Sequence, residues 1–213
     1  MKFAILCHWH TGSSLLAKTF RACGMEVGNK KTFWDPHLCD PQCEHSYLNG
    51  LGNDFLMGNI GKSSFEFGVR KIVESYVSQA KAHKWEHYGV KVTHAVQSQT
   101  WPVFRKAFLD IWGEDTIFVT TKRNSGAIIE STKDPLWPAD KVMKSWMSSI
   151  PAIVEIVSMK NGVGFTYPTD WYNGNLCKIV QDLGLPWTPE AENLFDPLRP
   201  READSDFRVY SKA

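Results

Sequence analysis

Short apolar runs alternate along this chain with segments in which apolar residues recur every three to four positions. The short runs are rich in β-branched and aromatic residues and predict strands at 3–7, 87–93, 116–121 and 163–167. The periodic segments predict helices at 13–22, 63–84, 101–112, 139–159 and 173–183. Strands that alternate with helices predict an α/β domain with a mainly parallel central sheet flanked by helices.

Local signals set the limits of these elements. Gly24 predicts the end of the first helix, and Ser63 with Glu66 forms a capping-box pattern at the start of another. Pro102 suits a first helical turn, and Pro151 predicts a kink in the helix 139–159. The weaker assignments are a strand at 25–27, a loop at 29–43, a helix at 44–57 and a helix from Asn124 or Ser125 to Ser131.

The totals describe one globular domain. The chain has 213 residues, of which 43% are hydrophobic, and it shows no repeat or low-complexity linker. A single domain is therefore expected over 1–213, with a polar tail at 197–213. The net charge is +1 and no basic block occurs, which argues against a nucleic-acid partner.

The chain carries no sign of a membrane or secretory location. No apolar run approaches the length of about 18 residues that a membrane span needs. Five cysteines, an odd number, favour reduced thiols and hence a cytoplasmic protein. Nine tryptophans are enough to fill a core and also to line a cleft.

The segment 3–16 combines a strand, a tight loop and the start of a helix. Gly12 stands between hydroxyl residues, so the backbone can turn tightly and direct N–H groups and the helix N-terminus at one point. Such a point attracts a phosphate or a sulfate. The loop is not a Walker A motif, which would need a glycine near Cys7 and a lysine at Ser13. An ordinary kinase or GTPase is therefore disfavoured, while a helix cap without a ligand remains an alternative.

A second candidate anion site follows the strand 116–121. Arg123 lies just past the carboxyl end of this strand, where open α/β sheets bind ligands. Ser131 comes eight residues later, about two helical turns on, so Asn124 and Ser131 should share a helix face. A phosphate there would meet a guanidinium and a hydroxyl. A surface ion pair is the alternative role of Arg123.

Taken together and in this order, the two stretches resemble the sulfotransferase family, whose members use 3′-phosphoadenosine 5′-phosphosulfate (PAPS). Arg123 and Ser131 match the pair that holds the donor's 3′-phosphate in that family. The segment 88–91 looks like its Gly-x-Lys strand, and 165–187 is similar to its closing strand and helix. The residues that match the family's 5′-phosphosulfate loop are His10, Thr11, Gly12, Ser13, Ser14 and Leu15.

The resemblance implies a P-loop-like sulfotransferase fold and transfer of a sulfuryl group from PAPS to a hydroxyl or amine. The products are the sulfated acceptor and 3′,5′-adenosine bisphosphate (PAP), and no metal is expected. The acceptor is a small molecule or a carbohydrate that the sequence does not identify, and the oligomeric state is equally open. A nucleotide phosphotransferase and a binding module without turnover are the alternatives.

The chain departs from the family pattern at three places. His10 stands where the family has Arg or Lys, and an imidazole is fully charged only when a bound phosphate raises its pKa. Lys18 or Lys91 would otherwise supply the positive charge. The segment 167–171 matches the family's Tyr-Glu-Asp-Leu strand loosely, and the late basic-glycine segment has no clear counterpart.

Two residues are candidates for the general base. Glu44 lies in a stretch similar to the Glu-x-x-x-Leu-Asn pattern of one branch of the family, and is preferred. His94 follows Lys91 in a stretch similar to the Lys-Thr-His of another branch, with one extra residue. The predicted catalytic set is thus Glu44, His94, His10 and Lys91.

A rival arrangement overlaps this set. The side chains with metal-ligand chemistry are His37, Cys39, Cys43 and His45. They lie within nine residues, and zinc bound there would compete with the role of Glu44. Their spacing is tighter than that of usual structural zinc sites.

Overall fold

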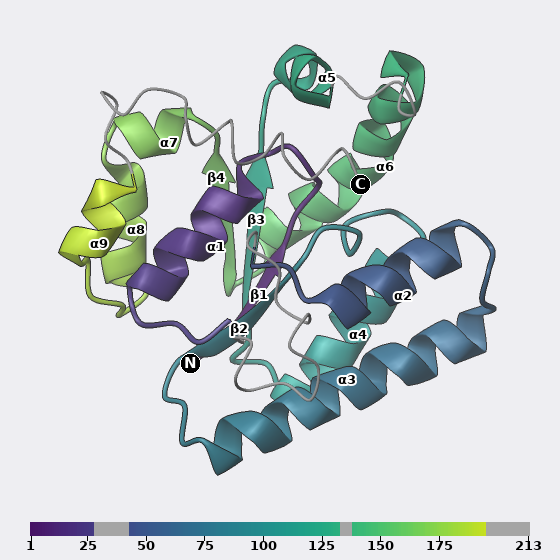
Figure 1. The fold of residues 1–213 in the computed structure, drawn as a ribbon, viewed down its shortest axis with the longest axis horizontal. Coiled ribbons are helices and arrows are strands. Elements are labelled where there is room, and N and C mark those ends of the chain that lie inside the picture. Colours follow the sequence, from purple (N-terminus) through teal and green to yellow (C-terminus); the bar gives the residue numbers. More distant parts are fainter. Residues whose placement is uncertain (28–42, 133–137, 195–213) are drawn as a thin grey trace, which may run out of the picture.

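The computed structural model describes residues 1–27, 43–132 and 138–194. Four parallel strands form one sheet in the order β2-β1-β3-β4 (Figure 1). The strands are β1 (Lys2–Leu6), β2 (Tyr88–Val92), β3 (Ile117–Lys122) and β4 (Gly162–Thr166). The prediction of a single α/β domain with a parallel sheet is confirmed. Because the strands are parallel, their carboxyl ends meet at one edge.

Helices cover both faces of the sheet (Figure 1). One face carries α1 (Ser13–Ala22), α7 (Thr169–Tyr172), α8 (Asn175–Asp182) and α9 (Pro189–Asn193). The other carries α2 (Ser46–Leu56), α3 (Lys62–Ala82), α4 (Trp101–Trp112), α5 (Ser125–Thr132) and α6 (Ala139–Ser158). Within the described ranges, no helix has both the length and the apolarity needed to cross a membrane.

The continuous apolar run of β1 has a direct structural reason. Phe3 and Ile5 pack into the core under α1, while Ala4 and Leu6 pack into the core under α3 and α4. Successive side chains of a strand point to opposite faces, and both faces are covered here, so each position must be apolar.

Two predicted helices have the predicted bounds. α1 begins after Gly12 and is followed by Gly24 at φ +91°, and α4 carries Pro102 in its first turn. These stop and start signals act within one turn of the backbone, so the sequence predicts them without tertiary information.

Other boundaries differ from the predictions. α3 begins at Lys62 after Gly61 and without a side-chain cap, so the predicted capping box is wrong. The predicted helix 173–183 is confirmed as α8 with slightly shorter bounds, because Gly174 at φ +78° precedes its first residue, Asn175. The short helix α7 lies before this range and was not predicted. The predicted strand 25–27 is reduced to one bridge between Glu26 and Tyr88.

The chain order places a switch point at the ends of β1 and β3. After β1 the chain runs through α1 to the Glu26 bridge beside β2, on one side of β1. After β3 it runs through α5 and α6 to β4, on the other side. Connections that leave neighbouring strands in opposite directions create the crevice in which open α/β sheets bind ligands.

Candidate functional site

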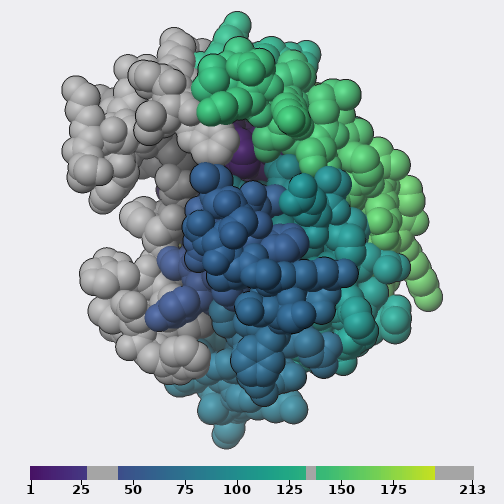
Figure 2. Space-filling view, turned by 90° about the vertical axis from the view of Figure 1, so that its right-hand side faces the viewer, coloured from purple at the N-terminus to yellow at the C-terminus, as the bar shows by residue number. Residues whose placement is uncertain are grey.

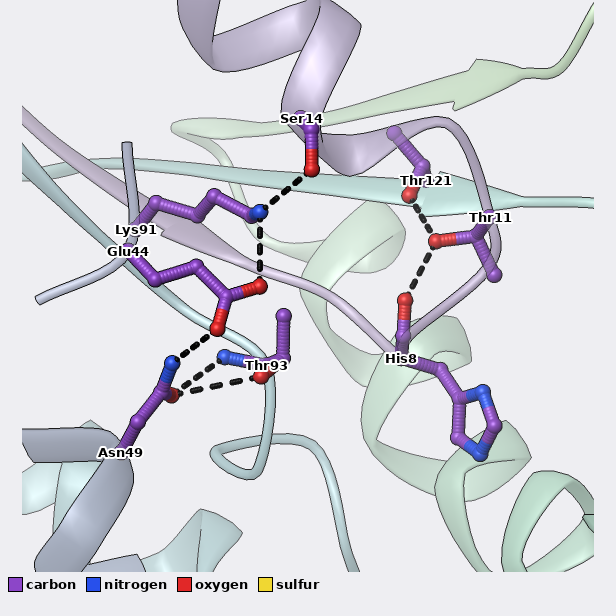
Figure 3. A network of polar contacts seen from close by, with 8 residues as sticks. All are labelled: His8, Thr11, Ser14, Glu44, Asn49, Lys91, Thr93 and Thr121. Atoms are coloured by element: carbon purple, nitrogen blue, oxygen red, sulfur yellow. Dashed lines mark hydrogen bonds and ion pairs between the residues drawn. The ribbon is translucent and has the colours of Figure 1, made fainter. Parts of the chain in front are cut away.

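The loop after β1 turns tightly and is fastened to β3. Thr11 is buried, its Oγ1 donates to the carbonyl of His8 at 2.6 Å, and it shares a hydrogen bond with the Thr121 hydroxyl (Figure 3). Gly12 then precedes α1 at φ +83° and contributes no capping side chain. The N-terminus of α1 therefore meets the switch point with backbone N–H groups, the arrangement that binds anions.

A Cβ atom at Gly12 has no room. It would lie 2.4 Å from Cδ2 of Tyr167, which follows β4. The glycine thus serves two purposes, the left-handed backbone and the close approach of the aromatic ring.

Lys91 is the centre of the polar network at this edge (Figure 3). Its side chain is completely buried, and its Nζ donates to Ser14 Oγ and to Glu44 Oε1, both at 2.9 Å. Ser14 lies in the first turn of α1, so one ammonium joins the candidate anion loop to the predicted base.

Backbone pairing next to β2 places Glu44. The N–H of His45 donates to the carbonyl of Lys91 at 3.0 Å, which sets the preceding residue beside the lysine side chain. His45 then caps α2 by accepting the N–H of Leu48. Asn49, one turn into α2, donates to Glu44 Oε2 at 2.6 Å and accepts the N–H of Thr93 at 2.8 Å. The carboxylate is therefore held from both sides.

Arg123 brings the second predicted anion stretch to the same edge. Its Nη1 donates to the carbonyl of His10 at 3.0 Å, and its Cζ lies 5.0 Å from the centroid of the Tyr167 ring. Its Nε is buried and has no hydrogen-bond partner within the described part of the chain. The ends of β1, β3 and β4 are thus joined around one guanidinium.

Among the described residues, no contact of its own draws Ser131 into this network. Its hydroxyl donates to the carbonyl of Ile128 at 2.8 Å, inside α5. The predicted cap of α5 is confirmed, because Asn124 Oδ1 accepts the N–H of Gly126 at 2.9 Å. A phosphate contact by Ser131 stays a prediction.

His10 and His94 both have a lowered pKa. The residue His10 is exposed as a whole, but its ring is partly buried. This partial burial lowers the pKa of the imidazole, and the Arg123 charge lowers it further. Burial lowers the pKa of His94, and the Glu44 charge opposes the shift. Both rings are therefore neutral at neutral pH, and Lys91 and Arg123 carry the positive charge of the site.

His94 lies beyond the strand alternation, since β2 ends at Val92. Its ring centroid is 5.6 Å from that of Trp9 in the β1 loop. Its Nδ1 is buried and has no hydrogen-bond partner among residues 1–27, 43–132 and 138–194. Both predicted bases thus lie near the β1 loop, with Glu44 in the better-defined position.

The sequence reasoning missed His8, a fully buried residue that ties the β1 loop to α6. Its Nδ1 lies 2.9 Å from the Trp9 carbonyl and its Nε2 lies 3.1 Å from Ser145 Oγ. A carbonyl only accepts, so Nδ1 carries the proton and Nε2 accepts from the serine hydroxyl. Gln97 donates to the same hydroxyl at 3.0 Å. The one signal in the sequence was a polar ring directly after a buried strand.

The burial of His8 predicts a loss of stability in acid. Burial lowers the pKa of His8 from 6.5 to about 4, so between these values the unfolded chain binds a proton that the folded chain does not. Stability falls as the pH drops below 6.5, by about 2 kcal/mol from this residue at about pH 5. Urea unfolding of the wild type and of His8→Gln across this range measures the difference. An equally steep loss in the variant would contradict the prediction.

Part of the predicted zinc cluster, His37 and Cys39, lies outside the described residues. Cys43 and His45 are both buried, and His45 serves as a helix cap. Within the described ranges, no group of three or more metal-ligating side chains occurs, and Cys7, Cys23 and Cys177 are free thiols.

No model of a protein family matches the chain, and no curated protein matches it.

Proposed function

We propose that this chain is a sulfotransferase that moves a sulfuryl group from PAPS to a hydroxyl or amine of a small-molecule or carbohydrate acceptor. The observation that carries the proposal is the place of Lys91, whose buried ammonium lies 2.9 Å from both Ser14 and Glu44. A cation, a helix N-terminus and a carboxylate meet there at the switch point of a parallel sheet. The fold is accordingly assigned to the P-loop-like sulfotransferases, and the odd number of cysteines supports a cytoplasmic location.

Two separate anion sites suit a donor that is charged at both its 3′ and 5′ positions. The loop from His10 to Leu15 and the N-terminus of α1 are assigned to the 5′-phosphosulfate. Arg123 and Ser131 are assigned to the 3′-phosphate. The Arg123 guanidinium supports this, since it has a buried Nε without a partner in the described residues and lies next to the loop.

The proposed chemistry is an in-line displacement at sulfur. Lys91 stabilises the negative charge that develops on the departing phosphate oxygen, and Ser14 orients the ammonium. Glu44 accepts the proton that the acceptor hydroxyl loses as its oxygen bonds to sulfur. His94 is the second candidate for the general base. Its neutral ring lies close enough to Glu44 for the carboxylate charge to act on the pKa of His94.

A calorimetric titration tests the proposal without an acceptor. PAP is expected to bind with micromolar affinity, and 5′-AMP to bind much more weakly because it occupies one anion site only. No binding of PAP, or a preference for ATP with magnesium, would reject the sulfotransferase assignment in favour of a phosphotransferase.

The Arg123→Ala variant is expected to weaken PAP binding about 30-fold, or about 2 kcal/mol, because a charge-assisted contact to a phosphate is lost. The affinity for 5′-AMP should change much less. Arg105→Ala is the matched control, since Arg105 forms an exposed ion pair with Glu155 at 3.0 Å. Equal PAP affinities of a folded Arg123→Ala variant and the control would contradict the assignment.

A further inference from the structure

His10 is the first residue of the candidate anion loop, and its backbone conformation is unusual. Its φ is +58°, in the left-handed region, and its carbonyl accepts a hydrogen bond from Arg123. The residue is exposed. Figure 2 shows purple atoms of the N-terminal segment between the blue of α2 and the green of α5 and α6, where this segment reaches the surface.

Burial of the ring and the positive charges around His10 oppose its protonation. The Arg123 guanidinium comes from the end of β3, and the N-terminus of α1 adds the positive end of a helix dipole. Glu44, before α2, is the carboxylate whose charge acts on His10, but it is already paired with Lys91. His8 begins the same loop and is itself held neutral by burial.

A bound dianion reverses this balance. A phosphate or phosphosulfate held at the N–H groups before α1 would bring negative charge to the loop that His10 opens, and negative charge favours the protonated imidazole. A fixed cation at this position would attract anions at any pH, whereas an imidazole contributes charge only when the anion is present.

We propose that His10 binds the donor's 5′-phosphosulfate as an imidazolium and takes up a proton when the donor binds. This inference rests on the proposed function, since it needs an anionic donor at the loop. Donor affinity then depends on pH. A group whose pKa rises on binding weakens the complex as the pH increases, by up to about tenfold per pH unit between its free and bound pKa values.

Calorimetry of the full chain with PAP tests the proton directly. Titration in two buffers of different ionisation enthalpy, at about pH 7, gives the number of protons taken up. The two variants are His10→Asn, a neutral side chain that tolerates the left-handed backbone, and His10→Arg, a permanent cation. The same ligand is used throughout, so the titration of its own phosphates cancels in the comparison.

The wild type is expected to take up about half a proton or more in excess of both variants. His10→Arg should keep the affinity at every pH, whereas the wild type should lose about tenfold or more relative to it between about pH 6 and pH 8. Binding with equal proton uptake in the wild type and His10→Asn would overturn this inference alone. Absence of PAP binding in all three proteins would overturn the proposed function and this inference together.

Discussion

Replacing Glu44 by glutamine is expected to lower the free energy of unfolding by about 4 kcal/mol, because a buried ammonium loses an anionic partner at hydrogen-bond distance. Lys91 is completely buried, and Glu44 Oε1 lies 2.9 Å from its Nζ. The hydroxyl of Ser14 still accepts from Lys91 in the variant, but it carries no charge. Urea unfolding at neutral pH measures the effect.

Two controls separate the ion pair from other effects of the substitution. Lys91→Met combined with Glu44→Gln removes both charges and should be more stable than Glu44→Gln alone, with a clear coupling energy in the double-mutant cycle. Glu66→Gln breaks an exposed pair with Lys62 and should change stability by about 0.5 kcal/mol or less. Additive losses in the cycle would contradict the prediction.

The same variant bears on function. A bound anion offers Lys91 a new partner, so PAP should stabilise Glu44→Gln against unfolding at least as much as it stabilises the wild type. If Glu44 is the general base, the variant keeps its donor affinity and loses turnover. His94→Gln is the corresponding test for the other candidate.

Gly12→Ala is expected to lower the free energy of unfolding by about 3 kcal/mol. The loss has two causes, backbone strain and a steric clash, which a second variant separates. A non-glycine residue at φ +83° is strained, and its Cβ would lie 2.4 Å from the Tyr167 ring, which must move. Donor binding should fall as well, because the displaced ring lies against Arg123. Thermal or urea unfolding and PAP titration give both quantities.

Gly174→Ala is the matched control for backbone strain. Gly174 precedes α8 at φ +78° and ψ 0°, close to the φ +83° and ψ 9° of Gly12 before α1. Apart from its chain neighbours, no atom of the described residues lies within 4 Å of the position that a Cβ at Gly174 would take. This variant therefore loses stability through backbone strain only. Equal losses in the two variants would show that the contact with Tyr167 contributes nothing.

Features that depend on a few neighbouring residues could be read from the sequence. The bounds of α1 and α4 follow from Gly12, Gly24 and Pro102, which act on the backbone within one turn. The parallel sheet follows from apolar runs such as β1, which suit a strand that is covered on both faces. The tight turn at Gly12 belongs to the same class, because its signal is one glycine between hydroxyl residues, while anion binding there stays a prediction.

Errors arose where neighbouring signals compete. Ser63 and Glu66 form a good capping pattern, yet α3 starts one residue earlier, at Lys62. Gly174 stands near the start of the predicted helix 173–183, and its left-handed backbone makes α8 begin only at Asn175. A periodic pattern gives the face that a helix buries but not the residue at which the backbone leaves the helix.

By itself, the sequence determined the class of fold, the strand that leads into the loop and the residue types of the candidate site. The tertiary structure alone decided which of them meet. Lys91 reaches Ser14 and Glu44, 77 and 47 residues away in the chain, because β2 pairs with β1 in a register that sets Lys91 opposite Ile5. His8 meets Ser145 across 137 residues because α6 packs over the sheet. Such contacts depend on strand register and helix docking, which are properties of the whole packed chain and leave no local pattern in it.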